Sequence, residues 1–255
     1  MLIKSKAIVI KTIKYGDQKL IVDFVTAAHG RMSSMVKIPA KGSSGKGGVG
    51  RGGVGRGGSF PKQFFQPLTI LTIETDYRER ESLQKIVSVS IAEPCPSLHS
   101  VPAKITISLF LAEVLSYAVH EENRDEEFFS FLENSILWLD VVESGYANFH
   151  IAFLVRLLRL QGFLPSSEES GKDDIFDLHS GEFLSTVPLH NQYLQAADAR
   201  MMKSLLRITY SNMHVFSLSR QERQRCLDII LLYCRIHIPS FPELKSLSVL
   251  REVFE

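Results

Sequence analysis

The chain has 255 residues, of which 45% are hydrophobic and 22% charged, an ordinary composition for a globular protein with one large or two small domains. The net charge of +1 hides a strong asymmetry, because residues 1–63 hold 12 Lys or Arg against two Asp or Glu. The rest of the chain holds 17 Lys or Arg against 26 Asp or Glu. This division favours a polyanion-binding N-terminal part joined to an acidic part, although a basic surface that serves solubility would give the same counts.

Cysteine usage and hydropathy exclude a protein held together by disulfides and a protein that spans the membrane with a helix. Cys95, Cys226 and Cys234 are too few for a disulfide framework, and no apolar run is long enough to cross a membrane. Lys4 and Lys6 lead into an alternating pattern rather than a signal peptide. We therefore expect a cytoplasmic protein with no membrane partner.

Short alternating segments separated by turn residues predict strands in the first 92 residues. Tyr15-Gly16-Asp17 and His29-Gly30 are the turn signals between the first three. Five such strands predict a small closed barrel of the OB type or a sandwich. The predicted strands are residues 6–14, 19–26, 31–38, 67–75 and 83–91.

The third predicted strand separates its side chains by face. Residues 32, 36 and 38 are apolar and have one parity, whereas Arg31 and Lys37 have the other. One face can therefore be buried while the other presents cations. Together with Lys11 and Lys14 of the first strand, Arg31 and Lys37 are candidate phosphate contacts.

Residues 39–63 contain a tandem repeat of the form Gly-Lys/Arg-Gly-Gly, with ten glycines between Gly42 and Gly58. Such a segment cannot build a core, so we expect a mobile loop of about 25 residues with a span of roughly 25–30 Å. An inert spacer would have the same composition, but regular cations and no carboxylate favour phosphate contact. The cations of the segment are Lys41, Lys46, Arg51, Arg56 and Lys62.

Glu93-Pro94-Cys95-Pro96 marks a boundary, beyond which the hydrophobic period becomes helical. We therefore predict an α+β protein with domains 1–92 and 93–255, the second with a short hairpin around residues 179–181. Ser219 and Glu222 predict a capping box that opens one long helix. The predicted helices are residues 102–121, 125–143, 146–161, 190–208, 218–238 and 242–254.

The sequence contains no recognisable catalytic or metal-binding constellation, so we expect no enzyme, no cofactor and no metal. Cys226 and Cys234 share an apolar helical stripe that predicts core packing. The acidic run at 121–127 could suggest a nuclease but more simply supplies charge to a helix N-terminus. Arg156 and Arg159 lie on the most apolar helix, where they are expected to bind either an internal carboxylate or an acidic peptide.

An ordered set of short motifs along most of the chain resembles the RecO family of bacterial DNA repair proteins, particularly its Bacteroidetes-like members. Each motif is weak alone, but their order and spacing are fairly specific. Two features differ from the family. Residues 166–185 contain no cysteine where many relatives have a four-cysteine zinc site, and the glycine repeat is peculiar to this chain. The motifs are Lys6-Ala7-Ile8-Val9-Ile10, Lys14-Tyr15-Gly16-Asp17, His29-Gly30-Arg31, Phe65-Gln66-Pro67-Leu68, Phe153-Leu154-Val155-Arg156-Leu157-Leu158 and Gly162-Phe163-Leu164-Pro165.

The resemblance implies an OB-fold domain followed by a helical domain, and a recombination mediator of the RecFOR pathway. Such a protein binds single- and double-stranded DNA, anneals complementary strands, acts with RecR and helps load RecA on strands coated by single-stranded DNA-binding protein (SSB). The resemblance also implies binding of the SSB C-terminal tail by the helical domain, for which Arg156 and Arg159 are the candidates.

The mechanism expected from these residues requires no chemistry. Cations neutralise phosphates, and Tyr15, Phe60, Phe64 or Phe65 add base stacking, although Phe64 and Phe65 are as well suited to the core. Three alternatives stay open at this point: an RNA- or ribosome-associated OB-fold protein, a nuclease that uses the acidic run, and a scaffold whose basic face binds an acidic protein.

Overall fold

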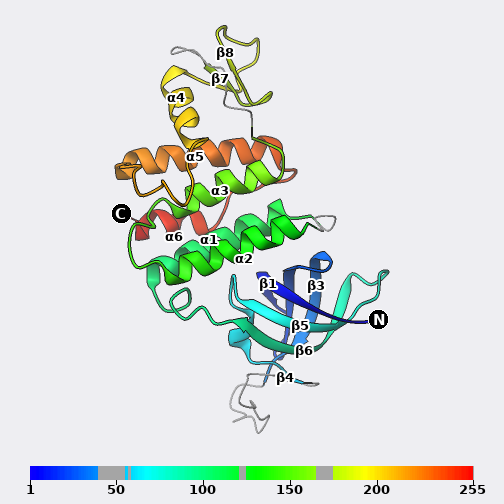
Figure 1. The fold of residues 1–255 in the computed structure, drawn as a ribbon. Helices are drawn as coiled ribbons and strands as arrows, with labels where there is room; N and C mark the ends of the chain where they lie inside the picture. The colour runs from blue at the N-terminus through cyan, green and yellow to red at the C-terminus, as the bar shows by residue number, and fades with distance from the viewer. Residues whose placement is uncertain (40–54, 57–58, 121–124, 165–174, 255) are drawn as a thin grey trace. The chain divides into compact units, whose positions relative to one another are not determined.

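The computed structural model describes residues 1–39, 55–56, 59–120, 125–164 and 175–254 (Figure 1). The chain divides into two compact units, Met1–Val141 with Leu244–Leu250 and Val142–Glu243 with Arg251–Glu255. Strands give way to helices after residue 93, as the sequence predicts. The first unit nevertheless includes the first two helices, and the domain boundary after residue 92 stays a prediction.

Five strands of the first unit form a closed barrel. Three antiparallel strands follow one another, β1 (Leu2–Lys14), β2 (Lys19–Thr26) and β3 (Gly30–Lys37). β5 (Ile70–Asp76) pairs with β1 and with β6 (Leu83–Glu93), and a parallel pairing of β3 with β6 closes the order β3-β2-β1-β5-β6. The predicted five-stranded barrel and the α+β class are confirmed. A two-residue strand, β4 (Gly55–Arg56), also pairs with β6.

The barrel core follows the strand period of two. In β3, Met32 and Val36 are at most 7% exposed, whereas Arg31 and Lys37 point to the other face as predicted. A bulge shifts the β1–β2 register between Val9 and Lys11. Val9 therefore stays in the core while Lys11 lies opposite Asp23 on the outside.

Three aromatic side chains after the glycine-rich segment close one end of this core. Phe60, Phe64 and Phe65 are 4%, 6% and 3% exposed, and the last two belong to a 3-10 helix, η1 (Lys62–Phe65). The backbone N–H of Phe60 donates to the carbonyl oxygen of Lys37 at 2.8 Å. The expectation that Phe60 stacks on bases is therefore wrong, and residues 59–63 belong to the barrel rather than to a mobile loop. Residues 40–54 and 57–58 of that predicted loop lie outside the described residues.

The first unit contains the whole of α1 (Pro102–Ala118) and α2 (Glu126–Val141), both close to their predicted limits. Pro102 occupies the start of α1, where its missing N–H costs no helical hydrogen bond. Lys104 of α1 is 4% exposed, but its ammonium donates to Ser97 Oγ at 2.5 Å and to the Asp140 carbonyl oxygen at 2.7 Å. These hydrogen bonds compensate the burial of its charge.

The second unit is built around α3, in which nine residues are buried, as its apolar sequence predicts. The capping box of Ser219 and Glu222 is present, and so is the predicted hairpin around residues 179–181. The helix expected from residue 190 instead begins at Ala196, because Tyr193 and Leu194 pair with β7. The elements of this unit are α3 (Phe149–Leu160), β7 (Ile175–Asp177), β8 (Glu182–Leu184), β9 (Tyr193–Leu194), α4 (Ala196–Leu205) and α5 (Arg220–His237). The last helix, α6 (Ser246–Val253), is divided between the two units after Leu250.

None of the helices in the described ranges combines the length and the apolar character that a membrane span requires.

Candidate nucleic-acid interface

The outer face of β1, β2 and β3 carries cations and apolar side chains in adjacent rows. Lys19 of β2 lies directly opposite Lys37 of β3, and the next outward pair is Ile21 with Met35. Cross-strand partners point to the same side of a sheet, and the alternating pair Leu20 and Val36 faces the core. We call this surface, with Ile13 and Tyr15 of β1 and its turn, the lysine face. Lys14 of β1 is paired with the inward Leu20, so it points to the other side of the sheet at the exposed end of the barrel.

Lys19 and Lys37 form a like-charged pair that the fold itself does not compensate. Both side chains and that of Lys14 are exposed, and no carboxylate of the described ranges lies within 4 Å of their ammonium groups. Like charges directly opposite on neighbouring strands repel each other. Their pairing therefore provides a site where an external anion relieves repulsion.

Apolar groups lie between and beside these cations. Ile13 is 47% and Tyr15 is 54% exposed, so both offer apolar surface to a ligand beside the cations. The backbone N–H of Tyr15 donates to the Lys19 carbonyl oxygen at 2.9 Å, which fixes the backbone of Tyr15 next to Lys19. An exposed aromatic ring next to cations suits a strand that offers both bases and phosphates.

Lys19 was missed by the sequence analysis. The signal was present, because the alternation of Leu20, Val22 and Phe24 inward places Lys19 outward. What the sequence lacked was the β2–β3 register, which shows that Lys19 faces Lys37.

The described residues on both sides of the glycine-rich segment meet at the same end of the barrel. Lys37 ends β3, and its carbonyl bonds to Phe60, two residues before the exposed Lys62. Lys62 and the lysine face are therefore neighbours at this end. Arg56 lies in β4, opposite Ser88 of β6. The predicted contacts Lys41, Lys46 and Arg51 lie outside the described residues.

Two of the predicted cations have neighbours within the protein. Lys11 is half-buried, with its ammonium 5.7 Å from the centre of the Tyr117 ring. Arg31 donates to Asp23 at 3.0 Å and to two carbonyl oxygens at the end of α1. These bonds make Arg31 a link between β3 and α1, so we do not include it in the lysine face.

Among the described lysines of the N-terminal strands, only Lys6 forms an ion pair with a carboxylate of a helix. The Lys6 ammonium lies 2.6 Å from Glu133 of α2 and 3.3 Å from Glu93. The hydrogen bond to Glu133, followed by that to Glu93, raises the pKa of Lys6 despite partial desolvation. Lys4, Lys14 and Lys19 have no such partner in the described ranges, so their positive field remains available to an external anion.

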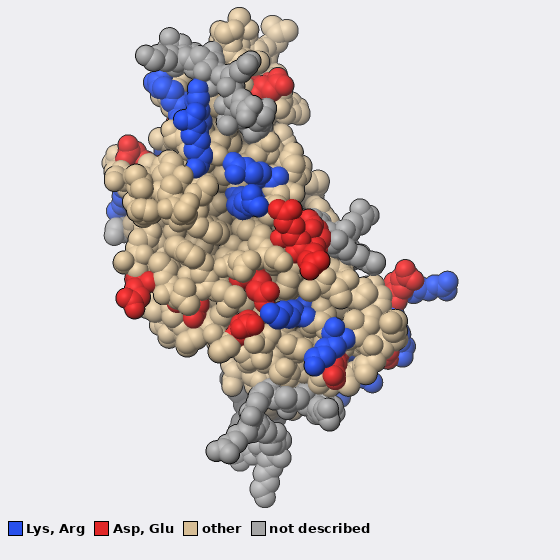
Figure 2. Space-filling model, in the orientation of Figure 1, with Lys and Arg blue, Asp and Glu red and all other residues tan. Residues whose placement is uncertain are grey.

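Arg156 and Arg159 of α3 are exposed, although the sequence suggested buried charges on this helix. They occupy the polar edge of a helix whose other residues are mostly buried. Arg159 donates to the Leu206 carbonyl oxygen at 2.6 Å. Figure 2 shows Lys and Arg side chains gathered where Figure 1 places α3, α4 and α5. The role of Arg156 and Arg159 in peptide binding stays a prediction.

The candidate catalytic and metal-binding groups have structural explanations where they are described. Asp125 accepts the Glu127 N–H at 2.8 Å at the start of α2, as expected of a capping residue. Burial raises the pKa of Cys226 to about 11 and that of Cys234 to about 12, so both thiols stay protonated and fill core positions. Within the described ranges, no three His, Cys, Asp or Glu residues are grouped as metal ligands.

The strand order and the parallel β3–β6 closure define an OB-type barrel. The family model "Recombination protein O N terminal" matches residues 1–95, and "Recombination protein O C terminal" matches residues 99–248. The chain therefore belongs to the RecO family.

Curated proteins that resemble the chain over its whole length are named DNA repair protein RecO. The protein of Bacteroides fragilis is 39% identical, that of Phocaeicola vulgatus 38% and that of Flavobacterium psychrophilum 34%. Each alignment covers 100% of both chains.

Proposed function

We propose that the chain acts in DNA repair as a non-enzymatic recombination mediator that binds single- and double-stranded DNA and anneals complementary strands. Membership of the RecO family supports the role in repair. The observation that carries the DNA-binding step is the opposed pair Lys19 and Lys37 beside the exposed ring of Tyr15, without a carboxylate partner in the described residues.

The energetics of binding follow from this arrangement. Phosphates next to Lys19 and Lys37 relieve the repulsion between the two ammonium groups and release counterions to the solvent, which gives affinity with little sequence preference. Tyr15 adds stacking on an unpaired base. Annealing then follows because two strands with screened charges approach each other and base pairing supplies the free energy.

The partners we propose are RecR and the SSB C-terminal tail, with the loading of RecA on SSB-coated strands as the outcome. The proposal of these partners and of this outcome rests on membership of the RecO family rather than on a contact in the structure. Arg156 and Arg159 are the proposed contacts for the acidic tail, because both are exposed cations on a helix of the second unit.

The test is a binding and annealing assay with 30-nucleotide strands, with and without SSB. Lys19→Ser with Lys37→Ser is expected to weaken binding of single strands about tenfold and to slow annealing. Lys4→Ser with Lys85→Ser is the matched control, because both lysines are exposed on the same barrel but lie outside the lysine face. Equal effects of the two double variants would contradict the lysine face as the binding site.

The same assay separates the alternatives. Preferential binding of RNA of equal length would favour an RNA-associated OB protein. Cleavage of labelled DNA that requires magnesium or manganese and follows the purified protein would identify a nuclease. Failure to bind either nucleic acid at low salt would favour a protein scaffold.

A further inference from the structure

The barrel contains an open pocket of about 660 Å³ between the start of β3 and the loop that joins β5 to β6. His29, Arg31 and Ser33 line it on one side, and Tyr77, Arg80 and Gln84 line it on the other. A volume of this size is typical of small-molecule binding sites. Every residue that lines the pocket belongs to the part of the chain that the structure describes.

An aromatic stack forms part of the wall. The His29 and Tyr77 rings are nearly parallel, with an interplanar angle of 12° and centroids 4.2 Å apart. The two residues come from different hairpins, so the stack joins the β2–β3 turn to the β5–β6 loop. Such a stack is a suitable surface for a further planar ring.

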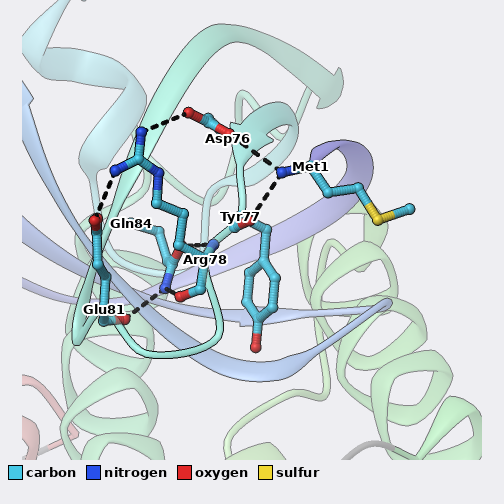
Figure 3. Close-up of polar contacts among 6 residues, drawn as sticks. All are labelled: Met1, Asp76, Tyr77, Arg78, Glu81 and Gln84. Atoms are coloured by element: carbon cyan, nitrogen blue, oxygen red, sulfur yellow. Dashed lines mark hydrogen bonds and ion pairs between the residues drawn. The ribbon is translucent and has the colours of Figure 1, made fainter.

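The loop that joins β5 to β6, which carries Tyr77, is held in place by hydrogen bonds (Figure 3). Gln84, which is 5% exposed, accepts the Arg78 N–H at 2.8 Å and donates to the carbonyl oxygens of Arg78 and Glu81 at 2.9 and 2.5 Å. The Arg78 guanidinium bonds Asp76 and Glu81 at 3.4 and 2.8 Å. The loop therefore keeps its shape without a ligand, which reduces the entropy lost on binding.

The charges of the lining indicate what kind of ligand group it accepts. Arg31 and Arg80 are balanced by Glu79 and Glu81, and Arg31 already bonds Asp23 and α1. A balanced lining favours a neutral group over a phosphate. Ser82 and the carboxylates of Glu79 and Glu81 offer a donor and acceptors to a polar heteroaromatic ring.

The distance between the pocket and the lysine face agrees with a neutral planar group that belongs to a nucleic-acid strand. Arg31 and Ser33 have the same outward parity as Lys37, four to six residues along β3. Six residues of strand span roughly 20 Å. Each nucleotide of a strand with stacked bases advances about 3.4 Å along the axis, so roughly four to six nucleotides would cover the distance.

We propose that this pocket receives one unpaired base of a single strand whose phosphates lie along the lysine face. The proposal rests on the proposed function and adds to it a preference for single strands, because a base in a duplex is not free to enter. A flexible strand reaches both sites, and the aromatic stack of His29 and Tyr77 then supplies affinity that salt does not screen.

Photocrosslinking tests the proposal on the unaltered protein. The probe is a 20-nucleotide thymidine strand in which one position carries 5-iodouracil, and the crosslinked peptides are identified by mass spectrometry. We expect crosslinks to Tyr77 or His29 that disappear when the probe is annealed to its complement. Binding without any crosslink in residues 27–33 or 77–84 would overturn the pocket while leaving DNA binding intact.

Variants supply the second measurement. Tyr77→Leu is expected to lower the affinity for the thymidine strand five- to tenfold and to leave duplex affinity unchanged, whereas Tyr77→Phe keeps both. Equal losses for single strand and duplex, or no loss for either, would also overturn the pocket. Failure of the wild-type protein to bind any strand would instead contradict the proposed function.

Discussion

Arg31 and Asp23 form an ion pair across β3 and β2, with Nη2 of Arg31 3.0 Å from Oδ2 of Asp23. The other terminal nitrogen of the guanidinium donates to the carbonyl oxygens of Ser116 and Val119 at 2.8 and 3.0 Å. The C-terminus of a helix leaves such carbonyls without helical partners and attracts positive charge. The Arg31 side chain therefore supplies hydrogen-bond donors both to the neighbouring strand β2 and to the C-terminal carbonyls of α1.

Replacing Arg31 by Met is expected to lower the free energy of unfolding by about 2–4 kcal/mol, because Asp23 and two carbonyl groups lose their donor. Urea unfolding measures the change. Lys37→Met, an exposed change on the same strand, is the control and is expected to stay within about 0.5 kcal/mol. A loss below about 1 kcal/mol for Arg31→Met would show that the link contributes little.

Salt dependence gives a quantitative check of the lysine face. If four or five phosphates are contacted, the logarithm of the association constant for single strands should fall with the logarithm of salt concentration with a slope of about −3. Lys19→Ser with Lys37→Ser removes two contacts, so the slope should become less steep by about 1.4. Anisotropy titrations from low to moderate salt measure it. A slope that stays the same would mean that neither ammonium group contacts a phosphate.

The cations of the glycine-rich segment are expected to add to this affinity. Changing Lys46, Arg51 and Arg56 to Ser should weaken DNA binding, because three phosphate contacts are lost. The melting temperature should not change, since the glycine repeat cannot contribute a core. Unaltered affinity would mean that the segment is only a spacer.

The first three strands could be predicted from local patterns because β1 and β2 are rich in β-branched residues and all three are separated by turns at Gly16 and Gly30, both with positive φ. The closure of the barrel could not, since the parallel pairing of Ser33 with Leu83 joins residues 50 positions apart. Lys19 shows the same limit, because alternation places it outward but only the register places it opposite Lys37.

The roles predicted from the sequence were wrong for side chains whose environment is set by tertiary contacts. Phe60 follows a glycine repeat and has no apolar neighbours in sequence, yet it packs in the barrel core. The carbonyl partners of Arg31 at the end of α1 lie 85 and 88 positions away, so no local pattern could identify them. Arg159 was expected in the interior, but it lies on the polar edge of α3.

Buried histidines predict how the stability of the protein depends on pH. His150 of α3 is 2% exposed, and desolvation, followed by repulsion from Arg223, lowers its pKa to about 3. In the unfolded chain, the His150 imidazole takes up a proton below pH of about 6.5, while the folded protein keeps it neutral. Protons therefore favour unfolding, and stability should fall between pH of about 6.5 and 3 by up to about 1.4 kcal/mol per pH unit for this residue.

His150→Leu is expected to remove that slope, which urea titrations between pH 6.5 and 5 measure. His99 contributes to the same interval, because burial also lowers its pKa, so some dependence should remain in the variant. Glu113 and Asp177 have lowered pKa values too, but as carboxylates they lose their stabilising effect only at more acidic pH. The exposed His214→Gln serves as the control. If wild type and His150→Leu show the same slope, the imidazole of His150 is charged or accessible in the folded protein.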